Sequence, residues 1–270
     1  MSGDGAEALV GIVPAAGRAQ RVLGLRWPKY LYPVGWEETH LGGTTVRRPR
    51  VVGARVMDGM IDAGVRGIYL IVNEANDPMR YFGAERRGTP IAYLCQSEPR
   101  GGAYAIDLAR PWLPARHTVL FGFPDTIVEP ASAFADLLGT HRATGADLSL
   151  GVFPTDHPET LSPVAIDGDR AVAIYDKPTH TSLRNTWGIA CWGPSVTALQ
   201  KVVIEGAPGG SELVPADLFV AAIQCGLNVR AHLFAQGGYF DVGTPRSLSE
   251  ALDRFGTTIF RADPSENTES

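Results

Sequence analysis

Short apolar runs alternating with amphipathic segments constrain the fold of this chain more than any other feature. Continuous apolar runs of this kind are typical of strands covered on both faces of a sheet. They span residues 9–15, 67–73, 91–96, 118–124 and 147–153. Between them, residues 51–63 and 131–142 place apolar side chains three and four positions apart, which predicts amphipathic helices. The alternation predicts an α/β fold with a doubly wound, mostly parallel sheet, whose ligands bind beyond the carboxyl ends of the strands.

The pattern changes in the second half of the chain. Residues 164–166 and 171–175 flank Asp167-Gly168-Asp169, whose composition favours a tight turn, so an antiparallel hairpin is expected there. Two further helices are expected over residues 195–204 and 214–225. The complete sheet is therefore expected to be mixed, with an antiparallel portion in the second half.

Nothing in the composition indicates a secreted or membrane protein, and we expect a soluble, cytoplasmic one. No positively charged leader precedes the first apolar run, and no apolar stretch approaches the ~20 residues of a membrane span. The three cysteines form no CxxC pair, so we expect buried, unpaired thiols and no zinc site. Because no repeat or linker divides the chain, a single domain is expected over residues 1–260, with a flexible tail over 261–270.

Charge is distributed unevenly along the 270 residues. The formal net charge of -5 argues against a nucleic-acid polymer as partner, because such proteins carry a basic face. Residues 14–50 nevertheless hold seven basic and only two acidic side chains. A focused positive segment attracts a small polyanion such as a nucleoside triphosphate into one cleft, and a solvated basic loop is the alternative.

The first apolar run leads into a turn of small residues, Ala15-Ala16-Gly17-Arg18. Small side chains let a ligand approach the backbone, where free amides bind phosphates or a base. The dinucleotide fingerprint GxGxxG is absent, which argues against an NAD-dependent oxidoreductase. Arg21 follows, and Lys29 comes eight residues later behind a proline, so both cations can converge on one polyphosphate.

This order of residues resembles the signature of the sugar-1-phosphate nucleotidyltransferases, of the glucose-1-phosphate thymidylyltransferase and UTP-glucose-1-phosphate uridylyltransferase types. The resemblance begins with small-small-Gly, then Arg, then Pro-Lys and Leu-x-Pro-Val. It continues, in the order of the family, through residues 93–106, 119–126, 173–192 and 239–251. Residues 211–217 resemble the family segment that introduces a helix before the last strands.

The resemblance implies a reaction and a set of site residues. A sugar 1-phosphate would attack the α-phosphorus of a nucleoside triphosphate, with dTTP or UTP favoured, and pyrophosphate would leave. The implied catalytic residues are Arg21, Lys29 and Lys177, and the implied ligands of Mg²⁺ are Asp125 and Asp241. The nucleotide would be bound by Ala15, Ala16, Gly17, Arg18, Gln96, Gly101 and Gly102. The sugar would be bound by Asp176, Lys177, Trp187 and Gly188. Residues 1–150 would form mainly the nucleotide half and 151–260 mainly the sugar half.

The sequence departs from the family pattern at several places. Ala19 and Gln20 replace the usual second glycine of the phosphate loop and the residue before its arginine. Ser162-Pro163 stands where the family has Tyr-Gly, so a backbone N–H toward the sugar is lost. Asp176 stands where the family has Glu, which suggests a different sugar. About ten residues between positions 36 and 46 have no counterpart in the family and form either a lid or a surface insertion.

Two alternatives stay open at this stage. A catalytically silent sugar-nucleotide sensor or regulatory subunit would share the fold, although it has little need of two metal carboxylates. Asp125 could also cap a helix rather than hold a metal. The base, the sugar and the oligomeric state, monomer or homo-oligomer, are not determined by the sequence.

Overall fold

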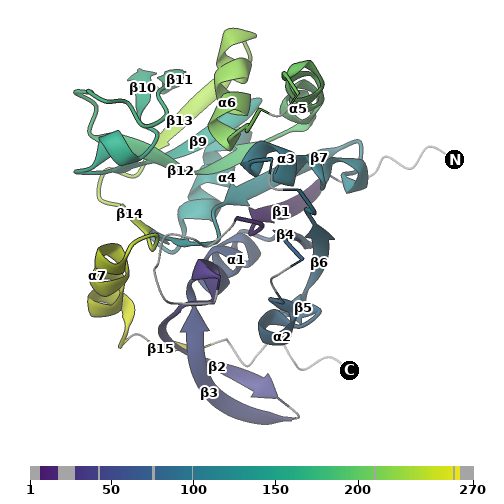
Figure 1. The fold of residues 1–270 in the computed structure, drawn as a ribbon, viewed down its shortest axis with the longest axis vertical. Helices are drawn as coiled ribbons and strands as arrows, with labels where there is room; N and C mark the ends of the chain where they lie inside the picture. The colour runs from purple at the N-terminus through teal and green to yellow at the C-terminus, as the bar shows by residue number, and fades with distance from the viewer. Residues whose placement is uncertain are drawn as a thin grey trace, which may run out of the picture.

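The computed structural model describes residues 7–17, 28–41, 43–74, 77–98, 100–209, 211–257 and 259–261. A ten-stranded mixed sheet runs through its centre, in the order β10-β11-β13-β9-β12-β7-β1-β4-β6-β5 (Figure 1). In the first half of the chain its strands are β1 (Ala8–Pro14), β4 (Ile68–Val72), β5 (Glu85–Arg86), β6 (Thr89–Cys95) and β7 (His117–Gly122). In the second half they are β9 (Leu148–Pro154), β10 (Val164–Asp167), β11 (Arg170–Ile174), β12 (Asn185–Trp192) and β13 (Val229–Leu233).

The four neighbouring strands β7, β1, β4 and β6 are all parallel to one another. Strand β12 lies antiparallel between β7 and β9, and the hairpin of β10 and β11 continues the sheet beyond β13. The prediction of an α/β fold with a parallel core and an antiparallel second portion is therefore confirmed. The carboxyl ends of the parallel strands share one edge of the sheet, where ligands of such folds bind.

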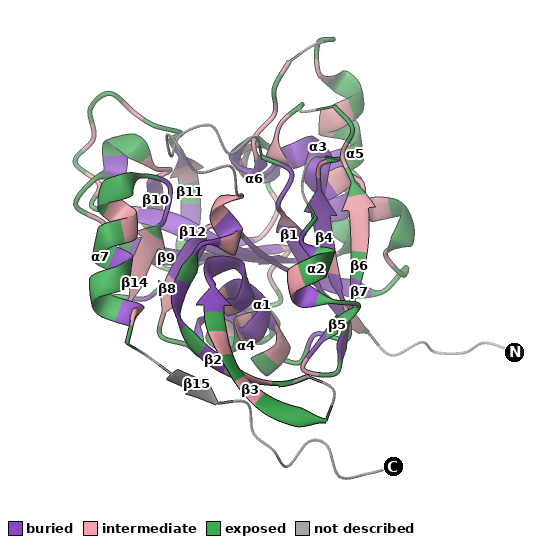
Figure 2. Cartoon of the chain, turned by 60° about the horizontal axis from the view of Figure 1, so that its bottom comes forward, coloured by how far each residue is buried: buried purple, intermediate pink, exposed green. Residues whose placement is uncertain are grey.

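Helices cover both faces of the sheet. Helices α3 (Gly102–Asp107), α5 (Pro194–Gly206) and α6 (Pro215–Gln224) contribute side chains to the core cluster on one face. Helices α1 (Val52–Asp62) and α4 (Ala133–Thr144) contribute to the cluster on the other face. Strands between them, such as β7, are buried along their whole length (Figure 2). The continuous apolar runs of the sequence follow from this double coverage.

Short elements complete the chain. They are α2 (Met79–Phe82) and three 3₁₀ turns, η1 (Lys29–Leu31), η2 (Arg110–Trp112) and η3 (Pro158–Thr160). A two-stranded sheet of β8 (Thr126–Glu129) and β14 (Gly238–Asp241) is followed by α7 (Pro245–Phe255). Helix α6 starts where residues 211–217 indicated a helix, and Asp217 accepts a hydrogen bond from the N–H of Val214 at 2.8 Å.

The segment near residues 36–46, which was expected to have no counterpart in the family, lies in a β-hairpin. Strands β2 (Pro33–Leu41) and β3 (Thr44–Val51) pair with each other, and β15 (Ile259–Arg261) pairs with β2. The hairpin extends away from the central sheet, and its outer end is exposed (Figures 1 and 2). The expectations for this segment were a lid or a surface insertion. The structure fits a surface insertion, which is built of two long strands.

A chain of buried ion pairs anchors the base of this hairpin. Arg86 donates to Glu37 on β2 at 2.6 Å and to Asp58 on α1 at 2.7 Å. Arg50 on β3 also pairs with Asp58, at 2.6 Å, and Arg48 pairs with Glu37 at 2.7 Å. Arg48 and Arg50 belong to the basic segment expected to attract a polyanion, and in the structure they neutralise carboxylates of the protein itself.

Two other expectations are tested by the fold. The prediction of buried thiols is wrong for Cys95 and Cys225, which are exposed, and right for Cys191. Cys95 ends an outer parallel strand and Cys225 ends a surface helix, so neither is covered. Within the described residues, no helix combines the length and the apolar character needed to cross a bilayer.

Candidate active site

The turn after β1 lies at the carboxyl edge of the sheet. The N–H of Ala15 donates to the carbonyl of Ile71 on β4 at 2.6 Å, and the side-chain amide of Asn73 donates to the carbonyl of Ala16 at 3.0 Å. Both alanines are buried, whereas Gly17 is exposed with open space around its Cα. Asn73, which holds this turn, was not singled out by the sequence. Arg18, Ala19, Gln20 and Arg21 lie outside the described residues.

Strand pairing brings the two predicted metal ligands together. Asp125 lies between β7 and β8, and its carbonyl accepts a hydrogen bond from the N–H of Val242 at 2.9 Å. Strands β8 and β14 pair so that Asp241 stands opposite Thr126, the residue after Asp125. Because Asp125 precedes a strand, the alternative in which it caps a helix is wrong. Two carboxylates far apart in the sequence therefore lie side by side at the carboxyl edge of the sheet.

Lys29 completes this cluster. Its Nζ lies 3.9 Å from Oδ2 of Asp125. A Cβ built on Gly243 would stand 2.8 and 3.0 Å from the carboxylate oxygens of Asp241 and 3.1 Å from Nζ of Lys29. The position of Gly243 thus locates one ammonium and both carboxylates around a small common volume. The sequence contained Gly243 within a matched motif but did not reveal that the cluster needs a residue without a side chain there.

Tyr239 lies beside the same carboxylates and was also missed by the sequence. Burial raises the pKa of its phenol well above the usual value, and the charges of Asp241 and Asp125 raise it further. Its ring packs against Gly188, where an added Cβ would approach the ring to 2.4 Å. The phenol is therefore neutral and connects the strand of the predicted sugar site with the carboxylate pair. A glycine at position 188 is required by this packing.

The two carboxylates fit a magnesium ion. Mg²⁺ in proteins is commonly held by one or two carboxylates, with substrate phosphates and water completing its coordination. Among the described residues, no group of three or more histidine, cysteine or acidic side chains is assembled that could enclose a metal by itself. Asp125 and Asp241, partly open to solvent and close to a cation, match a site that is completed by an anionic substrate.

The predicted base-reading residues meet at the end of β6. Gln96 follows this strand, and its side-chain amide donates to the carbonyl of Gly101 at 3.3 Å. Gly101 has φ of 104°, and an added Cβ would lie 2.3 Å from the carbonyl oxygen of Leu213. An added Cβ at Gly102 would contact Pro215 at 3.0 Å. These glycines allow the start of α3 to pack closely against the start of α6, so packing alone accounts for them.

The predicted sugar-binding residues come from a loop and a strand that lie next to each other. Asp176 and Lys177 are exposed in the loop between β11 and β12, and Lys177 has an unusual positive φ of 44°. Trp187 on β12 is only 3% exposed and packs against Phe123, with ring centroids 5.3 Å apart. Its indole Nε1 has no hydrogen-bond partner within the described structure. A buried donor without a partner is uncommon, because leaving it unpaired costs free energy.

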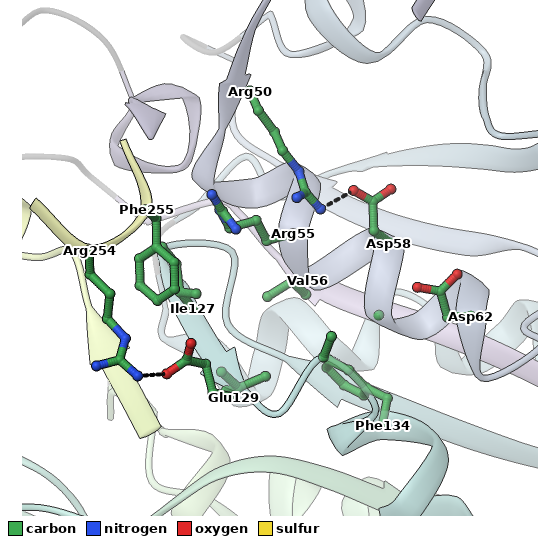
Figure 3. A pocket seen from close by; sticks show the side chains of 13 residues that line it. Arg50, Arg55, Val56, Asp58, Asp62, Ile127, Glu129, Phe134, Arg254 and Phe255 are labelled. Atoms are coloured by element: carbon green, nitrogen blue, oxygen red, sulfur yellow. Dashed lines mark hydrogen bonds and ion pairs between the residues drawn. The ribbon is translucent and has the colours of Figure 1, made fainter. Parts of the chain in front are cut away.

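A separate depression of about 530 Å³ lies between α1, β8 and α7 (Figure 3). Arg50 and Asp58 form an ion pair on one of its walls, and Arg254 and Glu129 form another, at 2.5 Å, on the opposite wall (Figure 3). None of the predicted site residues lines it.

The chain is similar to known proteins in both sequence and fold. Residues 51–257 match the model of the family described as nucleotidyl transferase. No curated protein sequence matches the chain.

Three solved structures share its fold over nearly their whole length. One is a protein of Bacillus anthracis described as a glucose-1-phosphate thymidylyltransferase and crystallised with sucrose, at 18% identity and a TM-score of 0.80, covering 94% of this chain and 97% of that one. The UTP-bound UGPase from Acinetobacter baumannii is 17% identical, with a TM-score of 0.73 and coverage of 92% and 93%. The inositol-1-phosphate CTP transferase from T. maritima is 18% identical, with a TM-score of 0.70 and coverage of 95% and 99%.

Proposed function

We propose that this chain, which belongs to the nucleotidyl transferase family, transfers a nucleotidyl group from a nucleoside triphosphate to a sugar 1-phosphate and releases pyrophosphate. The observation that carries the proposal is the cluster of Lys29, Asp125 and Asp241 at the carboxyl edge of the sheet. An oxygen of the sugar phosphate forms a bond to the α-phosphorus while the bond from that phosphorus to pyrophosphate breaks. No side-chain nucleophile is required.

Both reactants of this transfer are anions, so the protein must hold like charges together in line. Positioning and charge neutralisation are then the main sources of acceleration. Lys29 is suited to this task because its side chain is only 15% exposed, which strengthens its field at the reacting phosphates. In the proposal Lys29 acts together with Arg21 on the triphosphate, and Lys177 neutralises the phosphate of the sugar.

Asp125 and Asp241 are the residues that would hold Mg²⁺. When bound, the ion neutralises phosphate charge and orients the phosphates for in-line displacement. The backbone of β8 and β14 keeps the two carboxylates at a fixed separation, and Lys29 limits their mutual repulsion before substrate arrives.

The nucleotide is proposed to be a pyrimidine triphosphate, with dTTP or UTP favoured. The three similar structures are described as acting with, or bound to, thymidylyl, uridine or cytidine nucleotides. The proposal assigns recognition of the base to Gln96 and the backbone at Gly101, which are joined by a hydrogen bond of 3.3 Å, and binding of the phosphates to the turn of Ala15 and Ala16. The same proposal assigns the nucleotide mainly to residues 1–150, the sugar mainly to 151–260, and the enzyme to the cytoplasm.

The carboxylate pair provides the test. Asp125→Asn and Asp241→Asn should each lower kcat for pyrophosphate release by about 10²-fold or more, the scale seen when one preorganised electrostatic group is removed. Asp253→Asn is the matched control, since Asp253 is exposed on α7 and outside the cluster. Thermal unfolding should be nearly unchanged in all three variants. Full activity in either cluster variant would contradict the proposed role of the pair.

A further inference from the structure

Residues 161–163 form a short bridge between the two segments that carry the proposed sugar ligands. On one side, the N–H of Lys177 donates to the carbonyl of Leu161 at 2.9 Å, and the N–H of Tyr175 donates to that of Pro163 at 3.0 Å. On the other side, the N–H of Trp187 donates to the carbonyl of Ser162 at 3.3 Å. The backbone of this bridge is therefore held from both sides.

Ser162 also makes a side-chain contact with the proposed sugar ligand. Its hydroxyl donates a hydrogen bond of 2.8 Å to Oδ1 of Asp176. Within the described residues this is the one hydrogen bond that the Asp176 carboxylate makes, and no cation pairs with it. An exposed aspartate would otherwise sample several rotamers, so the contact with a fixed neighbour selects one orientation.

The backbone of the bridge offers a ligand no free N–H group. Pro163 has no N–H, and the N–H of Ser162 is already bonded to the hydroxyl of Thr186 at 3.3 Å. The N–H of Leu161 is bonded to the carbonyl of Pro158. The group left to recognise a sugar here is the Asp176 carboxylate, whose Oδ1 already accepts one bond while Oδ2 has no bond to a described residue.

We propose that Ser162 is a positioning residue that fixes the Asp176 carboxylate so that Oδ2 accepts one hydroxyl of the sugar 1-phosphate. The inference rests on the proposed function and adds a substrate requirement to it. One hydroxyl of the sugar is required to bond to Asp176, and the other hydroxyls of the ring make no contact with this carboxylate. Holding the carboxylate in advance lowers the entropy lost on binding, so the effect of Ser162 falls on acceptor affinity.

The first experiment measures steady-state pyrophosphate release with glucose 1-phosphate as the probe, using wild type, Ser162→Ala, Ser162→Thr and Ser182→Ala. Ser162→Ala should raise KM for glucose 1-phosphate about fivefold, with kcat and the KM for the triphosphate within twofold of wild type. Ser162→Thr keeps the hydroxyl and should restore KM. Ser182→Ala, an exposed serine of the same loop, should have no effect.

The second experiment repeats the comparison with the 2-, 3-, 4- and 6-deoxy derivatives of glucose 1-phosphate. The effect of Ser162→Ala on KM should disappear with one derivative and persist with the others, because only one substrate hydroxyl is coupled to Asp176. An unchanged KM in Ser162→Ala, or a loss that is equal for all derivatives, overturns the inference while leaving the proposed function standing. Absence of turnover in the wild type with every sugar phosphate overturns both.

Discussion

Replacing Gly243 by alanine tests the geometry of the proposed active site without removing any charged group. The added Cβ would stand 2.8 and 3.0 Å from the Asp241 oxygens and 3.1 Å from Nζ of Lys29, all closer than ordinary van der Waals contact. Ordinary contact begins at 3.4 Å, so the nearest carboxylate oxygen must move by about 0.6 Å and the ammonium by a few tenths of an ångström. Because a misplacement of about 1 Å at a catalytic group can lower the rate by about 10²-fold, we expect kcat/KM to fall by about 10- to 100-fold.

The folded state should tolerate this substitution. Gly243 is not among the residues with positive φ, so alanine fits its backbone, and we expect the free energy of unfolding to change by about 1 kcal/mol or less. Gly139→Ala on α4 is the control, because its Cβ would meet nothing within 4 Å and activity should be unchanged. Initial rates and urea unfolding of both variants give the comparison. A Gly243→Ala enzyme with kcat/KM within twofold of wild type would refute the placement of the cluster.

Three further substitutions or conditions test the fold around the site. Asp58→Ala leaves Arg86 and Arg50 buried without their shared carboxylate, so the free energy of unfolding measured in urea should fall by about 3–5 kcal/mol. A fall of less than about 1 kcal/mol would contradict the importance of these ion pairs. Burial lowers the pKa of His141, so the unfolded chain binds more protons than the folded one as the pH falls. The contribution of His141 to the free energy of unfolding should be full above about pH 6.5 and should be lost as the pH drops toward the folded pKa. His141→Gln should reduce this dependence of stability on pH. Gly101→Ala places an L-residue at φ of 104° and brings its Cβ into a clash with a backbone carbonyl. We expect the free energy of unfolding to fall by about 1–3 kcal/mol and the KM for the triphosphate to rise. An unchanged KM would leave Gly101 with a packing role alone.

The elements predicted from the sequence are those whose signals are local. The five apolar runs form strands, most of which are buried on both faces, which requires a continuous apolar pattern, and the helices between them bury one face, which requires a periodic pattern. The predicted ends of these elements differ from the structure by only a few residues. The turn at Gly168, which has φ of 61°, likewise depends only on its own residues.

The hairpin of β2 and β3 could not be predicted by the same rule. Its inward positions carry Glu37, Arg48 and Arg50, so the alternation of apolar and polar residues that marks a half-buried strand is missing. These charges become acceptable in the interior only because Arg86 and Asp58, distant in sequence, complete the ion pairs. Long-range pairing of this kind leaves no local trace.

The candidate site was predicted in its residue types but not in its geometry. The family resemblance named Asp125 and Asp241, whereas their juxtaposition arises from the pairing of β8 with β14, two strands too short to recognise in the sequence. Tyr239 and Gly243 gain importance only through that pairing. The contact of Ser162 with Asp176 depends in the same way on the bridge of residues 161–163 between a loop and strand β12.

The most direct test of the account is pyrophosphate release by the purified protein with Mg²⁺ across a panel of nucleoside triphosphates and sugar 1-phosphates. The account predicts release that requires one pyrimidine triphosphate and one sugar 1-phosphate together, with formation of the matching nucleotide sugar in equal amount. Binding of a nucleotide sugar in a calorimeter, with no release from any pair of substrates, would contradict it and would indicate a sensor that uses the fold without the reaction.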